Sequence, residues 1–237
     1  MPKKLGRQAT GSSTTGSVLL PPQATAASMP PSLTDPSLPL PRAIVFDLDY
    51  TLWPFWVDTH VTPPLKSNTH HSAAADRFGE EYAFYADVPS ILQALPRLPT
   101  NADDGGAPGS VALGVASRTH APSLARELLK MLHLPPLHTD SSSSSTSSTK
   151  EEKPRRALDA FEAGLEIYPS SKIRHFEALQ KRTGIRFEDM LFFDDEARNR
   201  DTETLGVTMW LVRDGVTWDE VDKGVAEWRR RRGYKPN

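Results

Sequence analysis

Short apolar runs that end in polar residues constrain this chain more than any other feature. Four such runs cover residues 43–46, 111–116, 190–193 and 207–212, and three of them end in a polar cluster. A short run that is apolar throughout is typical of a strand buried on both faces of a parallel sheet. Open parallel sheets bind their ligands beyond the carboxyl ends of the strands. The polar clusters therefore indicate a functional site at that edge.

Helical patterns lie between the predicted strands. Leucines recur at helical spacing over Pro122–His133, and apolar residues do so over Ile173–Arg182. A third pattern opens with Thr217 and Glu220, the signature of a capping box. Alternating strands and helices predict an α/β fold, with a mainly parallel sheet flanked by helices and joined by right-handed crossovers.

Low-complexity stretches mark off the folded part of the chain. Residues 1–42 are rich in Ser, Thr, Ala, Gly and Pro and contain no aromatic residue, which predicts a disordered tail. Basic residues near its start leave a mitochondrial targeting signal as the alternative, although the prolines oppose a long amphipathic helix. Within the domain predicted over 43–235, a Ser-rich stretch at about 139–156 predicts a disordered insertion, and Pro99–Ser110 predicts a loop.

Composition excludes several classes of protein. The absence of Cys excludes disulfide scaffolds, thiolate catalysis and Cys-ligated metal centres. No window approaches the roughly 18–20 continuous apolar residues of a membrane span, so we expect no membrane insertion. Lys and Arg total 28 against 30 Asp and Glu, a net charge of −2 that does not suggest nucleic-acid binding. These features fit a cytoplasmic monomer, with the nucleus as a second location.

The pair Asp47 and Asp49 is the most specific of the polar clusters. Both follow a buried strand directly, so both can face one crevice as the chain leaves the sheet. Carboxylates this close repel each other unless a cation lies between them, and oxygen ligands favour a hard ion, Mg²⁺ first. A calcium loop would need Gly where Leu52 stands. Two solvated turn acids are the other alternative, which the apolar strand before them opposes.

A hydroxyl and a lysine could contribute to an anion site. Ser117 and Arg118 follow the second apolar run, where a hydroxyl and backbone N–H groups can hold a phosphate oxygen, or where Ser can simply cap a helix. Lys172 follows Ser170 and Ser171, either of which would cap the next helix and place the lysine near its positive end. The alternative for Lys172 is an exposed surface lysine, which base rates favour for this residue taken alone.

The third polar cluster contains consecutive acids. Asp194, Asp195 and Glu196 follow two phenylalanines, and Asn199 stands one helical turn further on. Three acids in a row beside a buried strand are costly unless a metal ion or other cations compensate their charge. The cluster therefore favours a metal site.

Taken in order, these clusters resemble the haloacid dehalogenase superfamily. More closely, Ala43–Pro64, which reads AIVFDLDYTLWPFWVDTHVTPP, is similar to the opening of the magnesium-dependent phosphatase 1 family. Ser117-Arg118-Thr119, the Tyr168–Lys172 segment and Phe192–Asn199 also resemble motifs of that family. Ser170 stands where the family pattern leads us to expect Gly. The resemblance covers about 40–97, 110–135 and 165–215, and it implies a single Rossmann-like domain without a full cap domain.

The resemblance implies a Mg²⁺-dependent acid phosphatase that works through an aspartyl-phosphate. Asp47 would be the nucleophile, and Asp49 would protonate the leaving oxygen and then activate water. Mg²⁺ would be held by Asp47, the backbone carbonyl of Asp49, and Asp195. The substrate would be a phosphomonoester, either phosphotyrosine on protein or a sugar phosphate.

The resemblance also implies supporting roles at the same site. Ser117 and Lys172 would bind the phosphate oxygens. Asp194 and Asn199 would support the metal site through water or hydrogen bonds. Arg118 would contact the phosphate or the leaving group, or else belong to a structural ion pair.

The aromatic stretch Trp53–Trp56 follows the acid pair. It predicts either packing or a wall beside an aromatic or sugar leaving group, and His60 could line the mouth of the site. Two other classes of function stay open. One is a non-catalytic module that binds a phosphorylated ligand on the same fold. The other is an interaction protein that uses the tail, the Ser-rich insertion and the basic run Arg229–Arg232.

Overall fold

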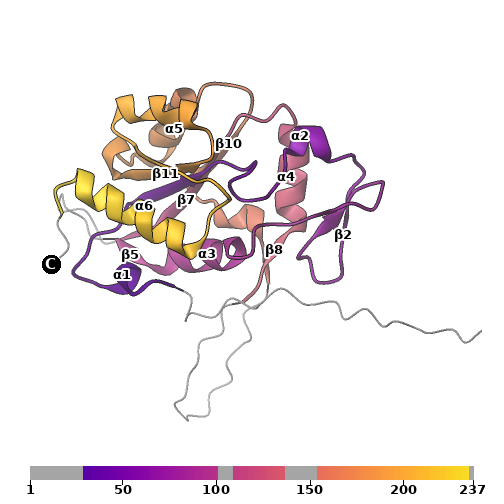
Figure 1. The fold of residues 1–237 in the computed structure, drawn as a ribbon, viewed down its shortest axis with the longest axis horizontal. Coiled ribbons are helices and arrows are strands. Elements are labelled where there is room, and N and C mark those ends of the chain that lie inside the picture. The colour runs from indigo at the N-terminus through magenta and orange to yellow at the C-terminus, as the bar shows by residue number, and fades with distance from the viewer. Residues whose placement is uncertain (1–28, 101–108, 137–153, 235–237) are drawn as a thin grey trace, which may run out of the picture.

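A five-stranded parallel sheet forms the centre of the computed structural model, which describes residues 29–100, 109–136 and 154–234 (Figure 1). The strand order is β10-β7-β1-β11-β12, with β1 in the middle. Every pairing between neighbours in this sheet is parallel. The strands are β1 (Ala43–Phe46), β7 (Ala112–Ser117), β10 (Gly164–Ile167), β11 (Met190–Asp194) and β12 (Thr208–Leu211).

The four apolar runs form β1, β7, β11 and β12, so the predicted α/β fold with a parallel sheet is confirmed. They are apolar throughout because both faces of the sheet are covered. In β1, Ile44 and Phe46 belong to one hydrophobic cluster, and Ala43 and Val45 belong to the other. The edge strand β10 escaped the sequence analysis because it is short and contains Glu166, whose carboxylate accepts a hydrogen bond from Arg182 at 2.6 Å.

Helices cover both faces of the sheet. The cluster on one face includes side chains of α3, α4 and α6, and the cluster on the other includes side chains of α5. Figure 1 shows α5 on one side of β11, and α3 and α6 on the other. The α-helices are α1 (Pro31–Thr34), α2 (Val57–His60), α3 (Val88–Ala94), α4 (Pro122–Met131), α5 (Lys172–Thr183) and α6 (Trp218–Arg231). Turns of 3-10 helix occur at η2 (Leu95–Arg97), η3 (Ala157–Ala160), η4 (Phe187–Asp189) and η5 (Ala197–Leu205).

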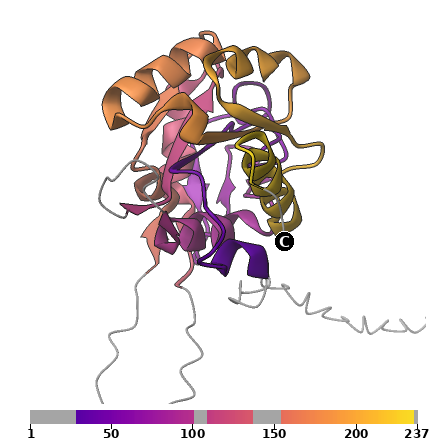
Figure 2. The same cartoon turned by 90° about the vertical axis from the view of Figure 1, so that its left-hand side faces the viewer.

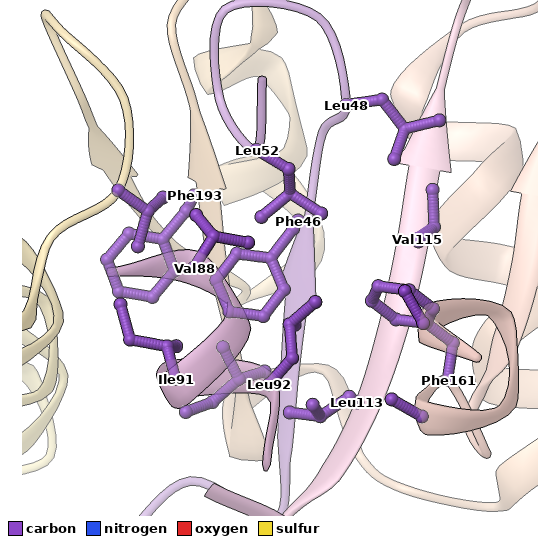
Figure 3. Close-up of a cluster of buried hydrophobic side chains, with 14 of the residues drawn as sticks. Phe46, Leu48, Leu52, Val88, Ile91, Leu92, Leu113, Val115, Phe161 and Phe193 are labelled. Atoms are coloured by element: carbon purple, nitrogen blue, oxygen red, sulfur yellow. The ribbon is translucent and has the colours of Figure 1, made fainter. Parts of the chain in front are cut away.

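The larger hydrophobic cluster lies against the face of β1 that carries Phe46 (Figure 3). Phe46 stacks on Phe193 of β11 with ring centroids 5.4 Å apart and planes 17° apart. Helix α3 adds Val88, Ile91 and Leu92, none of which is exposed to solvent. Because Phe46 and Phe193 directly precede the acid pairs, this close packing fixes the strand ends from which the acids project.

Both predicted helix caps are present, but the capping box of α6 lacks the bond that Glu220 was expected to make. Ser171 caps α5 by accepting a hydrogen bond from Arg174 N at 3.3 Å, so Lys172 is the first residue of the helix. Thr217 caps α6 by accepting from Glu220 N at 3.2 Å. The carboxylate of Glu220, however, accepts a hydrogen bond from Trp210 Nε1 at 2.6 Å, so it ties α6 to β12.

Residues 29–42 pack against the domain, although the sequence assigned them to the tail. Leu33 and Leu40 are buried in the larger cluster. Arg229 of α6 donates hydrogen bonds to the carbonyl oxygens of Pro39 at 2.8 Å and Ser32 at 2.9 Å. Figure 2 shows α1 at the foot of α6. These contacts lie far apart in sequence, so local composition could not reveal them; residues 1–28 lie outside the described residues.

The basic run Arg229–Arg232 is occupied by contacts within the domain. Arg230 and Arg231 pair with Glu227, and Arg232 pairs with Asp189 at 3.0 Å. Arg229 and Arg232 are therefore engaged within the domain, whereas the side chain of Arg230 is 71% exposed.

Small antiparallel sheets connect the main elements. Strands β2 (Lys66–Ser67), β3 (Ala74–Ala75) and β4 (Glu81–Tyr82) form one of them. Two further pairs are β5 (Pro99–Thr100) with β6 (Gly109–Ser110), and β8 (His133–Leu134) with β9 (Arg155–Arg156). The β5–β6 pair lies at the two ends of the predicted loop, and the β8–β9 pair lies at the two ends of the predicted insertion. Residues 101–108 and 137–153, which lie between the paired strands, are outside the described residues.

Between β1 and α3 the described chain forms α2 and the small β2–β4 sheet, and no full cap domain. Among the described helices, none has the length and hydrophobicity to cross a membrane.

Candidate active site

The site lies where the strand connections change direction. From β1 the chain crosses to β7 and β10 on one side, and it then returns to β11 and β12 on the other. Ligands of open α/β sheets bind at such a switch point, outside the carboxyl ends of the strands. Asp47 follows β1 and donates its backbone N–H to Phe193 O at 2.9 Å, which aligns it with the acids at the end of β11.

Lys172 is the central cation of the site. Its Nζ lies 2.6 Å from Asp47 Oδ1 and 2.9 Å from Asp194 Oδ2, and it also donates to Ala116 O at 2.5 Å. Only 2% of the residue is exposed, so the alternative of a surface lysine is wrong. Burial alone would lower the pKa of Lys172, but Asp47 and Asp194 outweigh burial and raise it above its ordinary value. The amine is therefore charged, and it can serve as the positive partner of an anion.

Asp49 is held by two N–H donors. Its Oδ1 accepts hydrogen bonds from Trp53 Nε1 at 2.7 Å and from the backbone N–H of Val57 at 3.2 Å. Burial raises the pKa of Asp49 to about 6, against the lowering effect of these two donors. A carboxyl with this pKa can be protonated in mildly acidic solution, which is what a general acid requires.

A chain of hydrogen bonds links Arg118 to the central lysine. Arg118 Nη1 donates to Asn199 Oδ1 at 3.2 Å, and Asn199 Nδ2 donates to both oxygens of Asp194 at 2.8 and 2.9 Å. Asp194 in turn pairs with Lys172. Asp194 and Asn199 are buried and do not line the cavity. Arg118 bonds to an amide in place of the ion pair that was the alternative for it.

Ser117 ends β7 inside the site. Only 1% of the surface of Ser117 is exposed, and its Oγ accepts a hydrogen bond from Thr119 N at 3.4 Å. Helix α4 begins after Ala121, which supplies no side-chain cap. Ser117 therefore does not cap that helix, and it is one of the residues that line the site cavity.

Asp195 is half-buried at the end of β11. Burial raises its pKa to about 6, and the neighbouring Asp194 and Glu196 add to the shift. Glu196 itself pairs with Arg198, whose Nη2 lies 2.6 Å from Oε1. Asp195 forms no ion pair with the described residues, and the charge of Lys172 only partly offsets the rise in its pKa.

A cavity of about 440 Å³ brings the predicted groups together. Its walls include Asp47, Asp49, Ser117, Arg118, Lys172 and Asp195. The cavity is also lined by residues that were not predicted as site residues from the sequence, because loops, α2 and η5 carry them and no spacing rule points to them. These are Asp58, Thr59, Thr119, His120 and Arg198.

Some residues of the aromatic stretch Trp53–Trp56 pack in the core, and one lines the cavity. Trp53 and Phe55 are buried, with ring centroids 5.3 Å apart and planes 2° apart. Trp56 is 50% exposed and lines the cavity. His60 lies outside the cavity walls and contacts Trp56, whose ring centroid is 5.6 Å away.

The charges of the site fit a hard metal ion. No group of three or more His, Asp or Glu side chains in the described residues is arranged to hold one. The predicted donors are instead the side chains of Asp47 and Asp195 with the backbone carbonyl of Asp49. Burial raises the pKa of Asp47 well above its ordinary value even with Lys172 beside it, and Asp195 shifts in the same direction. A cation between these oxygens would offset the excess negative charge.

A parallel sheet that gathers aspartates from two neighbouring strand ends around one buried lysine is the arrangement of haloacid dehalogenase-type hydrolases. The sequence model of the Acid Phosphatase family matches residues 39–231. The chain belongs to this family, within the haloacid dehalogenase superfamily.

Curated relatives agree with this assignment. A HAD-like hydrolase superfamily protein of Schizosaccharomyces pombe is 40% identical over 173 residues, which cover 73% of this chain and 86% of the relative. Magnesium-dependent phosphatase 1 of Homo sapiens is 38% identical over 187 residues, 78% of this chain and 86% of the relative. A putative magnesium-dependent phosphatase of Saccharomyces cerevisiae is 32% identical over 189 residues, 75% and 92% respectively.

Proposed function

We propose that this protein is a Mg²⁺-dependent phosphatase that hydrolyses phosphomonoesters through an aspartyl-phosphate intermediate. One observation carries the proposal above all. Asp47 is held against a buried, charged lysine, and it shares a cavity with a second carboxyl, Asp49, whose raised pKa suits an acid. Family membership and the names of the relatives support the same activity.

The two acids divide the chemistry between them. A carboxylate oxygen of Asp47 attacks phosphorus, and the bond from phosphorus to the leaving oxygen breaks as Asp49 gives that oxygen a proton. In the second step Asp49, now ionised, takes a proton from water as the water oxygen attacks the aspartyl-phosphate. The bond to Asp47 then breaks, which releases inorganic phosphate and restores both groups.

The remaining side chains bind the phosphoryl group. Lys172 and the Ser117 hydroxyl hold its oxygens, and Arg118 stands at the same wall. Mg²⁺ would be held by Asp47, Asp195 and the backbone carbonyl of Asp49. When bound, it supplies positive charge that reduces repulsion between the carboxylate nucleophile and the phosphate. We expect phosphotyrosine or sugar phosphates as substrates, because the described residues form no full cap domain that would restrict access to the cavity.

Hydrolysis of p-nitrophenyl phosphate tests the proposal. We expect turnover in the presence of Mg²⁺ and none after treatment with EDTA, with recovery when Mg²⁺ is returned. The EDTA-treated protein should keep its circular dichroism spectrum, which separates loss of metal from unfolding. A folded, Mg²⁺-supplied protein that binds phosphate but hydrolyses neither this ester nor a panel of phosphotyrosine and sugar phosphates would favour the binding module instead.

The rate on an alkyl phosphate should fall as pH rises above about 6. Asp49 must be protonated to serve as the acid, and burial raises its pKa to about 6. Its acid form therefore decreases by about tenfold for each pH unit beyond that value, and kcat/KM should follow. The measurement is a profile of kcat/KM against pH, with Asp49→Asn expected to lack this limb. A wild-type rate that stays flat or rises into alkaline solution would contradict the assignment.

A further inference from the structure

Two donors occupy one oxygen of Asp49 and leave the other free. Oδ1 accepts from Trp53 Nε1 at 2.7 Å and from Val57 N at 3.2 Å. No described residue donates a hydrogen bond to Oδ2. Because Oδ1 is engaged by N–H groups, Oδ2 is the oxygen left to carry a proton into the cavity that Asp49 lines.

The indole of Trp53 is itself rigidly placed. None of its surface is exposed, and it does not line the cavity, so it cannot be a wall for substrate. Its ring stacks with the ring of Phe55, at a centroid distance of 5.3 Å, and with that of Phe84, at 6.0 Å. A backbone bridge between Asp49 and Trp53 also fixes the turn that joins them. The aromatic stack therefore aims one N–H at one carboxylate oxygen.

We propose that Trp53 is a positioning residue, whose indole N–H fixes the orientation of the Asp49 carboxyl so that Oδ2 faces the leaving oxygen of the substrate. This inference rests on the proposed phosphatase function. In this inference Trp53 touches neither substrate nor metal and acts only through the general acid, Asp49. Misplacement of a catalytic group by about 1 Å can cost on the order of 10²-fold in rate.

The test compares two leaving groups in the Trp53→Phe variant, which keeps an aromatic ring but deletes the N–H. p-Nitrophenolate leaves readily without a proton, whereas the alkoxide of glycerol 2-phosphate needs one. We expect kcat on glycerol 2-phosphate to fall about 10- to 100-fold with KM little changed, and kcat on p-nitrophenyl phosphate to fall much less. In an Asp49→Asn background the same substitution should add no further loss on glycerol 2-phosphate.

Trp218→Phe is the matched control. Trp218 is also buried, and its Nε1 donates to Ser90 Oγ at 2.9 Å, away from the cavity. If Trp53→Phe and Trp218→Phe have the same effect, or if Trp53→Phe slows both substrates equally, the inference is overturned while the phosphatase function stands. A wild-type protein that hydrolyses neither substrate overturns the proposed function, and the role of Trp53 with it.

A spectroscopic measurement keeps the test decisive if Trp53→Phe does not fold. The Trp53 indole N–H of the wild-type protein should resonate downfield, as expected for a donor to a carboxylate, and it should move upfield in Asp49→Ala. An indole resonance that Asp49→Ala leaves unchanged would overturn the inference.

Discussion

Asp47→Asn should abolish turnover of p-nitrophenyl phosphate, with a loss in kcat of at least about 10³-fold. An amide oxygen is a far weaker nucleophile than a carboxylate, and no other described carboxylate in the cavity is bonded to Lys172. The fold should survive because Asn has the same shape and its Oδ1 can still accept the hydrogen bond from Lys172. Burial also opposes the charge of Asp47 in the wild-type protein, so removal of that charge relieves a cost.

Steady-state kinetics and thermal unfolding of the same preparation check this prediction. Asp201→Asn makes the same chemical change on the exposed surface of η5 and should leave kcat unchanged. An Asp47→Asn variant whose kcat stays within about tenfold of wild type would mean that another group attacks phosphorus.

Lys172→Met should lose both activity and stability. Methionine preserves the length of the side chain but removes the cation that lies between Asp47 and Asp194. Removing one partner from a buried ion pair typically costs about 3–5 kcal/mol, because the remaining charge stays buried without compensation. We expect a decrease of this order in the unfolding free energy at neutral pH, and a fall in kcat of about 10³-fold because the phosphate loses its cation.

The way in which the loss of unfolding free energy varies with pH distinguishes the missing charge of Lys172 from a packing defect. Burial already raises the pKa of Asp47, and Lys172 opposes that shift, so without the lysine Asp47 binds its proton still more tightly in the folded chain than in the unfolded chain. The defect should therefore be small in acid, where Asp47 is protonated, and it should grow as pH rises past the ordinary carboxyl range. Denaturant titrations over that range measure it, with Lys181→Met on the exposed surface of α5 as the control. A destabilisation that does not vary with pH would contradict the electrostatic explanation.

A single rule of strand placement was enough to predict that Asp47 and Asp195 would lie near each other, and both line the same cavity. Asp47 and Asp195 follow apolar runs, and parallel strands bring their carboxyl ends to one edge. Lys172 was harder to place. Its helix and cap were predictable, but its burial depends on Asp47, 125 positions away in the chain. The role of Trp53 could not be predicted either, because spacing does not reveal where an indole N–H points.

The N-terminal boundary of the domain failed to show in the sequence for a similar reason. Leu33 and Leu40 stand in a Pro- and Ser-rich background, so their composition suggests a tail. What holds them is Arg229, whose own basic neighbours suggested a solvated or interacting surface. Neither stretch carries enough information alone, because each is the other's partner.

The bond between Arg229 and the segment around Ser32 has a consequence for synthesis of the chain. The two residues are 197 positions apart, and α6 is the last helix among the described residues. Because translation proceeds from the N-terminus, the segment around Ser32 emerges from the ribosome long before its partner does. The carbonyl groups of Ser32 and Pro39 therefore gain their Arg229 hydrogen bonds only late in synthesis, once α6 has been made.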